Sequence, residues 1–281
     1  MASFLLACCF IFSFVLTGCN GSPNAKQIVS KSISAINKTQ TYALDSNITN
    51  IYTVVGGDNQ RVNTAGWINS GVFDIRQAKM KMTSTIDSNY SGAQIHWLGE
   101  KYIVNRQEFI SNQLNYGNST WVKKELPDKS PISKSELFQQ ANLLKTASNV
   151  VLAGNEKVEG MDCYVLNITP SVQTIIEWVI SQEQPYGPQL DVMNGGAITV
   201  VRADAYRNAS VKLWIDRDTF LPVKAEIQAV FQGDVGEGSI TETPYTPSTN
   251  PVNSTFNGQV IFSNYNQPVT IELPPEALNA E

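Results

Sequence analysis

Long runs in which apolar and polar residues alternate constrain the fold of this chain more than any other feature. One run covers residues 42–55, and its apolar side chains share one parity: Tyr42, Leu44, Ile48, Tyr52 and Val54. Successive side chains of a β-strand point to opposite faces of the sheet, so this period of two indicates a long strand with one buried face. Similar runs recur almost to the end of the chain, which predicts an antiparallel sheet of many strands.

Further strands are expected at regular intervals along the chain. They cover Arg61–Ile68, Phe73–Thr85, Gln94–Leu98, Tyr102–Arg106, Trp121–Leu126, Val150–Val158, Met161–Thr169, Ile198–Tyr206, Ser210–Asp216, Phe220–Phe231 and Asn257–Phe262. Turn residues lie between several of them, as in Gly56–Asn59 and in the hairpin expected at Gly99-Glu100. Short turns between successive strands favour a meander, in which strands adjacent in sequence pair with one another.

Three helices are predicted among the strands. Ala25–Asn37 has Val29, Ile33 and Ile36 on one face, and a second helix over 133–148 opens with a capping box of Ser133 and Glu136. The third helix, over 171–184, carries apolar residues around much of its circumference. A surface helix needs only one apolar stripe. This helix is therefore either deeply buried in an ordinary core, or it faces the sheet on one side and an apolar ligand on the other.

The N-terminus has the pattern of an export signal. A nearly continuous apolar run from Phe4 to Leu16 suits a signal peptide and is short for a membrane span, which needs about 20 residues. The run ends in Leu16-Thr17-Gly18-Cys19, which resembles the lipobox of bacterial lipoproteins, although no Lys or Arg precedes it. An ordinary signal peptide with an incidental cysteine is the alternative interpretation.

The lipobox resemblance predicts that residues 1–18 are removed and that Cys19 carries acyl chains such as palmitate. Residues 19–25 would form a tether, and residues 26–281 a single domain anchored to the extracytoplasmic side of the cell membrane. Cys8 and Cys9 leave with the signal, so Cys163 would be the one free thiol of the mature chain. It lies in an alternating run and is expected to be a buried small hydrophobe.

Composition and motifs argue against several function classes. The chain carries a net charge of −5 with 16% charged residues, so it lacks the basic clusters that nucleic acids require. No sequence motif for a hydrolase, a nucleotide site or a zinc site is found, and neither a metal nor a cofactor is expected. The candidates for acid–base chemistry are the single histidine, His96, and the pair Asp216 and Asp218. A structural histidine and a polar turn are the simpler interpretations, so the chain is not expected to be an enzyme.

Three segments resemble a known superfamily of lipoprotein carriers, the LolA/LolB-like and LppX/LprG-like proteins. The segment 158–166 is similar to their V-x-G-x-x-(C/T)-Y-x-L hairpin, and the segment 214–224 is similar to a W-I-D-x-x-T-x-L-P hairpin. Near the C-terminus, residues 262–271, followed by Pro274-Pro275, resemble the closing y-n-x-P-V-x-I-x-x-P motif. In order and spacing, the resemblance extends over residues 25–281.

The resemblance implies an α+β, mainly β fold: a curved antiparallel half-barrel whose concave face is covered by helices, with an apolar cavity between them. Acyl chains could occupy such a cavity, because burial of apolar surface contributes about 25 cal/mol per Å². The side chains expected to line it are Leu44, Ile48, Tyr52, Met80, Met82, Trp97, Leu144, Ile175, Ile176 and Val179.

The function expected from these features is binding of lipids or lipidated molecules, for carriage or presentation, by a lipoprotein attached to the membrane through Cys19. Two alternatives stay open at this stage. The chain could be a sensor or regulatory module that binds an envelope protein, or a structural lipoprotein whose interior is filled by its own side chains.

Overall fold

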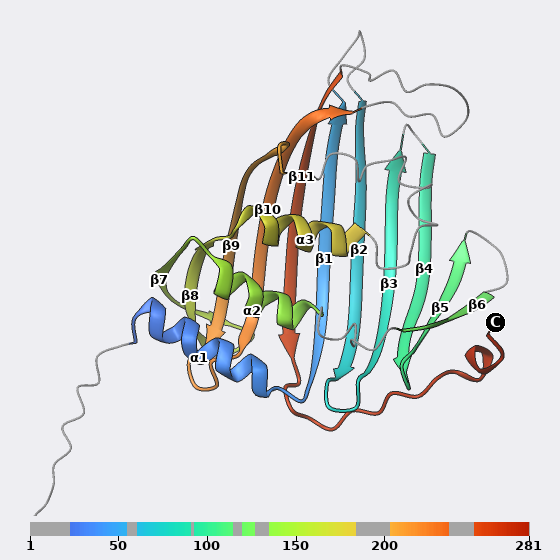
Figure 1. Ribbon diagram of the computed structural model, residues 1–281, viewed down its shortest axis with the longest axis horizontal. Coiled ribbons are helices and arrows are strands. Elements are labelled where there is room, and N and C mark those ends of the chain that lie inside the picture. Colours follow the sequence, from blue (N-terminus) through green and yellow to red (C-terminus); the bar gives the residue numbers. More distant parts are fainter. Residues whose placement is uncertain are drawn as a thin grey trace, which may run out of the picture.

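A computed structural model describes residues 23–54, 61–90, 93–114, 120–126, 135–183, 203–235 and 250–280. These residues form one open sheet of eleven strands with three α-helices against one of its faces (Figure 1). Along the sheet the strands lie in the order β6-β5-β4-β3-β2-β1-β11-β10-β9-β8-β7. All neighbours pair antiparallel. The fold class predicted from the sequence, a mainly β half-barrel rather than a closed barrel, is confirmed.

The strands form two meanders that meet in the middle of the sheet. The first comprises β1 (Thr41–Val54), β2 (Arg61–Asp74), β3 (Lys79–Tyr90), β4 (Ala93–Val104), β5 (Gln107–Leu114) and β6 (Thr120–Glu125). The second comprises β7 (Asn149–Val158), β8 (Met161–Thr169), β9 (Tyr206–Asp216), β10 (Pro222–Val235) and β11 (Asn250–Ser263). The last strand, β11, pairs with the first, β1, and so joins the two meanders.

The helices lie over the part of the sheet that contains β7–β11 and β1. They are α1 (Ala25–Lys38), α2 (Glu136–Thr146) and α3 (Val172–Glu183), and Figure 1 shows all of them on the same face of the sheet. A capping box formed by Asn24 and Gln27 begins α1, because each side chain accepts a hydrogen bond from the other residue's backbone N–H. We call the face under the helices the inner face and the opposite one the outer face.

Side-chain hydrogen bonds join α2 and α3, the two helices in the middle third of the chain. The hydroxyls of Thr146 and Thr174 are 2.7 Å apart where α2 ends and α3 begins. Further along, the indole Nε1 of Trp178 donates to Glu136 Oε2 at 3.3 Å. These contacts make α2 and α3 one layer, and the ring of Trp178 joins this layer to the sheet.

Trp178 fits the sheet at a glycine. A Cβ atom at Gly258 of β11 would lie 2.7 Å from Cη2 and 2.9 Å from Cζ2 of this indole, closer than real Cβ contacts come. The indole itself is 1% exposed. Gly258 is therefore needed at this position so that α3 can approach the strand.

Replacing Gly258 with alanine is expected to lower the free energy of unfolding by about 1–3 kcal/mol, the usual cost of overpacking a filled core. Gly66 is the matched control, because a Cβ there would meet its nearest atoms at 3.7 and 3.9 Å, which is ordinary contact. Chemical denaturation of G258A and G66A measures the difference. Equal stabilities of the two variants would show that Trp178 moves aside without cost.

Several expected strand boundaries are wrong in the first meander. The hairpin expected at Gly99-Glu100 is absent, because β4 runs unbroken through these residues and pairs with β3 from Ala93 to Ile103. The turn comes later, at Asn105 and Arg106, both of which have positive φ. It leads into β5, which the sequence analysis did not predict as a strand.

Two other expected strands differ from the structure. Phe73–Thr85 is interrupted by a turn, where the Asp74 carboxylate accepts the N–H of Gln77 at 2.8 Å and Ala78 has positive φ. The end of Ile198–Tyr206 is a turn over 203–205, and β9 begins at Tyr206. The expected turn at Gly56–Asn59 and the capping residue Ser133 lie outside the described residues.

Candidate functional site

The residues predicted to line a ligand site come together on the inner face. One cluster of buried residues contains eight of them: Leu44, Ile48, Tyr52, Met80, Leu144, Ile175, Ile176 and Val179. Met82 is partly buried and packs against this cluster. The side chain of Trp97 lies outside the described part of the structure. The predicted parity of β1 and the predicted inward side of α3 therefore agree with the structure.

The same cluster contains larger side chains that the sequence analysis did not single out. They are Trp67, Trp178, Phe231, Phe256 and Phe262, each no more than 1% exposed. For Trp67, Phe231 and Phe262 the signal was the period of two within the expected strands, whereas Phe256 lies one residue before the expected strand Asn257–Phe262.

The inner face changes character across the sheet. On β8–β10 its buried side chains are apolar, as in Leu166, Leu213 and Ile227. On β1–β3 the buried side chains include amides and hydroxyls among the apolar ones: Ser46, Asn50, Asn63, Asn69 and Ser84. A ligand spanning this face would meet apolar groups beneath the helices and uncharged hydrogen-bonding groups beside them.

The polar groups on β1–β3 are partly paired with one another. Ser46, Asn69 and Ser84 occupy one row across three strands, in register. The Asn69 amide donates to Ser46 Oγ at 3.0 Å and its carbonyl oxygen accepts from the Ser84 hydroxyl. The next row toward the far end of β1 contains Ile48, Trp67 and Ile86. Trp67 therefore lies next to the buried polar row of Ser46, Asn69 and Ser84.

Several buried polar side-chain atoms, Ser32 Oγ among them, have no protein hydrogen-bond partner among the described residues. The indole Nε1 of Trp67 and both amide atoms of Gln140 in α2 belong to this group. Trp67 is 1% exposed and Gln140 is 0% exposed. A buried polar group without a hydrogen bond costs about 1–3 kcal/mol, so such groups in native proteins are normally met by water or by a ligand.

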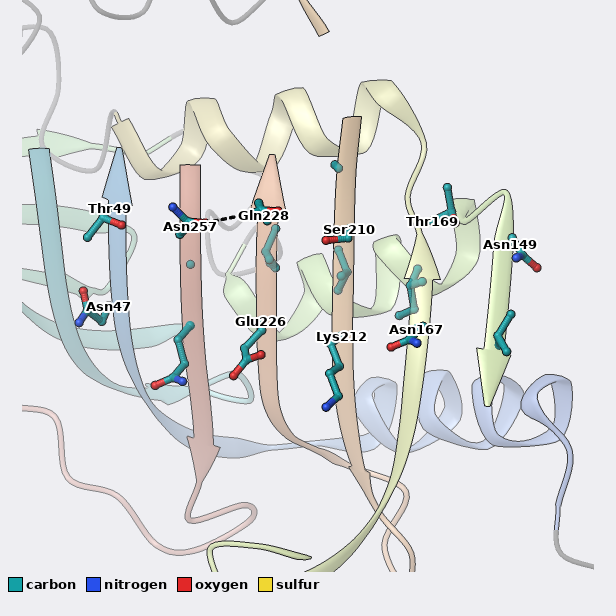
Figure 2. A pocket seen from close by; sticks show the side chains of 17 residues that line it. Asn47, Thr49, Asn149, Asn167, Thr169, Ser210, Lys212, Glu226, Gln228 and Asn257 are labelled. Atoms are coloured by element: carbon teal, nitrogen blue, oxygen red, sulfur yellow. Dashed lines mark hydrogen bonds between the residues drawn. The ribbon is translucent and has the colours of Figure 1, made fainter. Parts of the chain in front are cut away.

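A hollow of about 830 Å³ lies on the outer face, away from the predicted lining residues (Figure 2). Its side chains form rows across six strands, from β1 to β7. One row contains Asn47, Gln259, Glu226, Lys212, Asn167 and Val151. The next contains Thr49, Asn257, Gln228 and Ser210. Most of these side chains are polar and two carry charges, as is usual for a solvated sheet face, so the hollow does not have the lining of an acyl-chain site.

The two charges in the hollow are already paired. Lys212 Nζ lies 2.9 Å from Glu156 Oε1, and Glu226 Oε1 lies 2.7 Å from Lys224 Nζ. The Trp214 indole N–H donates to Glu156 at 2.7 Å and, together with Lys212, lowers the pKa of that carboxyl. Such mutually neutralised pairs offer little attraction to a charged ligand.

The acid–base candidates from the sequence lie apart, in an exposed pair on the outer face and in the turn between β9 and β10. His96 Nδ1 lies 2.6 Å from Asp87 Oδ1 on the outer face, with both side chains 64% exposed. Asp216 accepts the backbone N–H of Asp218 at 3.4 Å and that of Thr219 at 3.1 Å, which shapes the turn between β9 and β10. Among the described residues no group of three or more His, Cys, Asp or Glu side chains is arranged to hold a metal ion.

Cys163 is buried, at 0% exposure, in a small cluster of its own on the outer face with Val165, Trp214 and Val223. Burial raises the pKa of its thiol to about 11, and the negative charge of Asp216 adds to the effect. A thiol of high pKa carries little of the reactive thiolate. This placement confirms the expectation of a buried small hydrophobe.

We expect Cys163 to react with a disulfide reagent at pH 8 only after unfolding. Since an unfolded cysteine has a pKa of about 8.5, burial of the neutral thiol stabilises the fold fully below pH 8.5. That contribution is lost as the pH rises toward about 11. As the pH rises from 8 to 11, the free energy of unfolding of wild type should therefore approach that of C163A. A stability difference that grows with pH would contradict the assignment.

Comparisons with known proteins give one family model and several solved structures of low sequence identity. A family model described as a family of unknown function, DUF6612, matches residues 24–281. Among solved structures, lipoprotein LppX of Mycobacterium tuberculosis is 13% identical with a TM-score of 0.42, covering 87% of this chain and 96% of that one. LprF of Mycobacterium bovis is 14% identical with a TM-score of 0.48, covering 90% and 99%.

A LolA superfamily protein of Nitrosomonas europaea is 13% identical with a TM-score of 0.23, covering 89% of this chain and 96% of that one. LppX and the LolA superfamily are the groups whose motifs this sequence resembles. No curated protein matches the chain significantly. None of the helices in the described ranges combines the length and apolar character needed to cross a bilayer.

Proposed function

The chain belongs to the DUF6612 family, a family of unknown function, and from that premise we propose that it binds lipids or lipidated molecules between its sheet and its helices. The observation that carries the proposal is the buried layer on the inner face. It joins apolar side chains of β8–β11 and α3 to buried polar groups, of which Trp67 Nε1 and the Gln140 amide have no protein partner among the described residues. Buried polar groups are normally hydrogen-bonded, so these groups are available to a ligand or to water.

The arrangement suits acyl chains for a physical reason. Each CH₂ group that leaves water for this layer contributes about 0.8 kcal/mol. The sheet is open at β6 and β7, and the helix layer contacts it through side chains rather than through strand pairing. The helices can therefore move relative to the sheet without breaking backbone hydrogen bonds of the strands, and a chain could enter beneath them.

The proposal includes attachment to the membrane through an acylated Cys19, on the extracytoplasmic side. Cys19 and the signal lie outside the described residues, so the support is the lipobox pattern Leu16-Thr17-Gly18-Cys19. The first helix begins at Ala25, six residues after this cysteine. A tether of that length would keep the sheet and its helices close to the membrane that supplies the ligand.

Native mass spectrometry of residues 20–281 tests the proposal. We expect an adduct of lipid-like mass that is released on denaturation. Val179→Thr should reduce the adduct, because it places a hydroxyl in a fully buried apolar contact of α3 at constant volume. Val172→Thr, on the same helix but 37% exposed, is the matched control. A clean apo mass that persists after envelope lipids are added would refute lipid binding and favour a protein partner.

A further inference from the structure

The exposed side of α1 is basic. Lys26, Lys31 and Lys38 are all exposed on this helix, whereas Ile28 and Ile36 belong to the stripe that it buries. The fourteen residues of α1 include no Asp or Glu. The whole chain, in contrast, carries a net charge of −5. The charge of α1 is therefore opposite in sign to that of the rest of the molecule. We call the surface formed by the three lysines the basic face of α1.

The charges of the basic face are not neutralised within the part of the chain that the structure describes. None of its three lysines forms an ion pair with a described carboxylate. Lysines of the sheet differ, because several of them have a glutamate as partner: Lys81 with Glu100, Lys101 with Glu108, Lys212 with Glu156 and Lys224 with Glu226. The basic face is therefore free to attract an anionic partner.

Aromatic rings hold one lysine of this face beside the turn between β9 and β10. Lys31 Nζ lies 4.5 Å from the centroid of the Phe220 ring. This ring stacks on Tyr164, with centroids 6.1 Å apart, and the Arg217 guanidinium lies 5.3 Å from the Tyr164 ring. Asp218 follows Arg217 directly and offsets its charge, so the excess of positive charge stays on α1. The contact with Phe220 fixes how α1 is turned relative to the sheet.

The expected acyl anchor is close to the basic face along the chain. Cys19 precedes Ala25, the first residue of α1, by six residues. Six residues span at most about 20 Å when they are fully extended. An acylated Cys19 would therefore hold the start of α1 near the membrane surface. The field of that surface acts over about 8 Å at physiological ionic strength, a distance within the reach of the tether.

We propose that the basic face of α1 docks on anionic phospholipid headgroups of the membrane that holds the Cys19 anchor. The inference rests on the attachment through Cys19 that the proposed function includes. Each lysine near an anionic surface favours the docked state roughly fivefold, and the acidic remainder of the chain is repelled by the same surface. The anchor fixes one point, and the basic face sets the orientation. The helix layer then faces the membrane and the outer face of the sheet points away from it.

Lysine labelling of the acylated protein in vesicles tests the docking. The protein is reconstituted in vesicles of dioleoylphosphatidylcholine, alone or mixed with dioleoylphosphatidylglycerol, and acetylated with a water-soluble succinimidyl ester. Peptide mass spectrometry gives the labelling rate of each lysine. We expect Lys26, Lys31 and Lys38 to react at least about fivefold more slowly on the anionic vesicles. Lys123 and Lys124 should react alike on both, because they are exposed on β6, far from α1 at the other edge of the sheet (Figure 1).

Charge removal separates electrostatic docking from mere closeness to the membrane. Lys26→Gln combined with Lys38→Gln removes two charges and leaves Lys31 as the reporter. We expect Lys31 in this variant to react on anionic vesicles within about twofold of its rate on phosphatidylcholine. Lys123→Gln combined with Lys124→Gln is the matched control, because it removes the same charge from β6 and should leave Lys31 protected. Salt at 1 M shortens the screening length to about 3 Å and should also abolish the protection.

The outcomes distinguish the docking from the anchor. Equal protection on both kinds of vesicle would mean that the tether alone covers α1, which overturns the electrostatic contact. Absence of protection on anionic vesicles that still carry the protein overturns the docking and leaves the anchor standing. Protection that appears only in native envelopes would assign an acidic protein to the basic face and overturn the lipid surface. A purified chain without acyl mass would refute the attachment through Cys19, and this inference with it.

Discussion

Replacing Trp178 with alanine is expected to lower the free energy of unfolding by about 3–5 kcal/mol, the range for buried aromatic residues. The indole is 1% exposed, fills the space above Gly258 and bonds Glu136 of the neighbouring helix. Its loss removes apolar contact with the sheet and the side-chain link between α2 and α3. Denaturation followed by far-UV circular dichroism measures the effect. A loss below about 1 kcal/mol would mean that the helix layer is held elsewhere.

A double-mutant cycle with Gly258→Ala identifies the contact itself. In wild type the added methyl group collides with the indole, but in W178A it enters the space that the ring has left. The alanine should therefore destabilise wild type and be neutral or stabilising in W178A, a coupling of at least about 1 kcal/mol. Gly66→Ala, which meets only ordinary contacts, should have the same effect in both backgrounds. Additive losses for the Trp178 and Gly258 pair would rule out the direct contact.

The sequence predicted the fold class because strand parity is a local signal. In β1, for example, the expected range 42–55 and the observed Thr41–Val54 nearly coincide. Boundaries failed where tertiary pairing outweighed local signals. Gly99 resembles a turn residue, yet pairing with Ser84 of β3 keeps it within β4. The turns at Asn105-Arg106 and Ala78 use positive φ without glycine, and the residue types at Arg106 and Ala78 give no marker for it.

The candidate site was predictable only in its apolar half. Ile48 of β1 and Val179 of α3, both expected to line the cavity that the resemblance implies, lie in one buried cluster. The polar half was missed because an inward Asn69 or Gln140 interrupts the apolar pattern and looks like a solvated position. Whether such a group is buried, and whether it has a hydrogen-bond partner, depends on the register of the strands and on the position of α2 against the sheet. Neither is encoded over a short stretch of sequence.

The motifs that suggested a carrier superfamily serve mainly to build the sheet. The Tyr265 hydroxyl donates to the carbonyl of Pro222 at 2.7 Å, and the Asn266 side chain accepts the N–H of Gln40 at 2.8 Å. Together they fasten the end of β11 to the starts of β10 and β1. At the hairpin of β7 and β8, Gly160 adopts a φ of +82° that favours glycine. Such motifs report how the strands of the sheet are joined, and they do not identify a ligand.

Replacing Cys19 with serine is expected to move the protein from the membrane fraction to the soluble fraction almost completely. Serine cannot form the thioether to diacylglycerol, and each lost CH₂ of the acyl chains removes about 0.8 kcal/mol of membrane affinity. Two chains anchor a protein stably, whereas none leaves only weak surface contacts. Fractionation of cells followed by immunoblotting, with intact mass measurement of the purified chain, detects both the change of location and the missing acyl mass.

Cys163→Ala is the control for this experiment, because it removes the other cysteine of the expected mature chain while leaving Cys19 in place. It should stay in the membrane fraction and keep the acyl mass. A Cys19→Ser protein that stays on the membrane at full length would contradict cleavage and acylation at Cys19 and point to retention by the uncleaved apolar run Phe4–Leu16. If the wild-type protein and the Cys19→Ser protein are both cleaved and both found in the soluble fraction, the N-terminus is an ordinary signal peptide. The mass of the N-terminal peptide therefore decides between the two interpretations that the sequence leaves open.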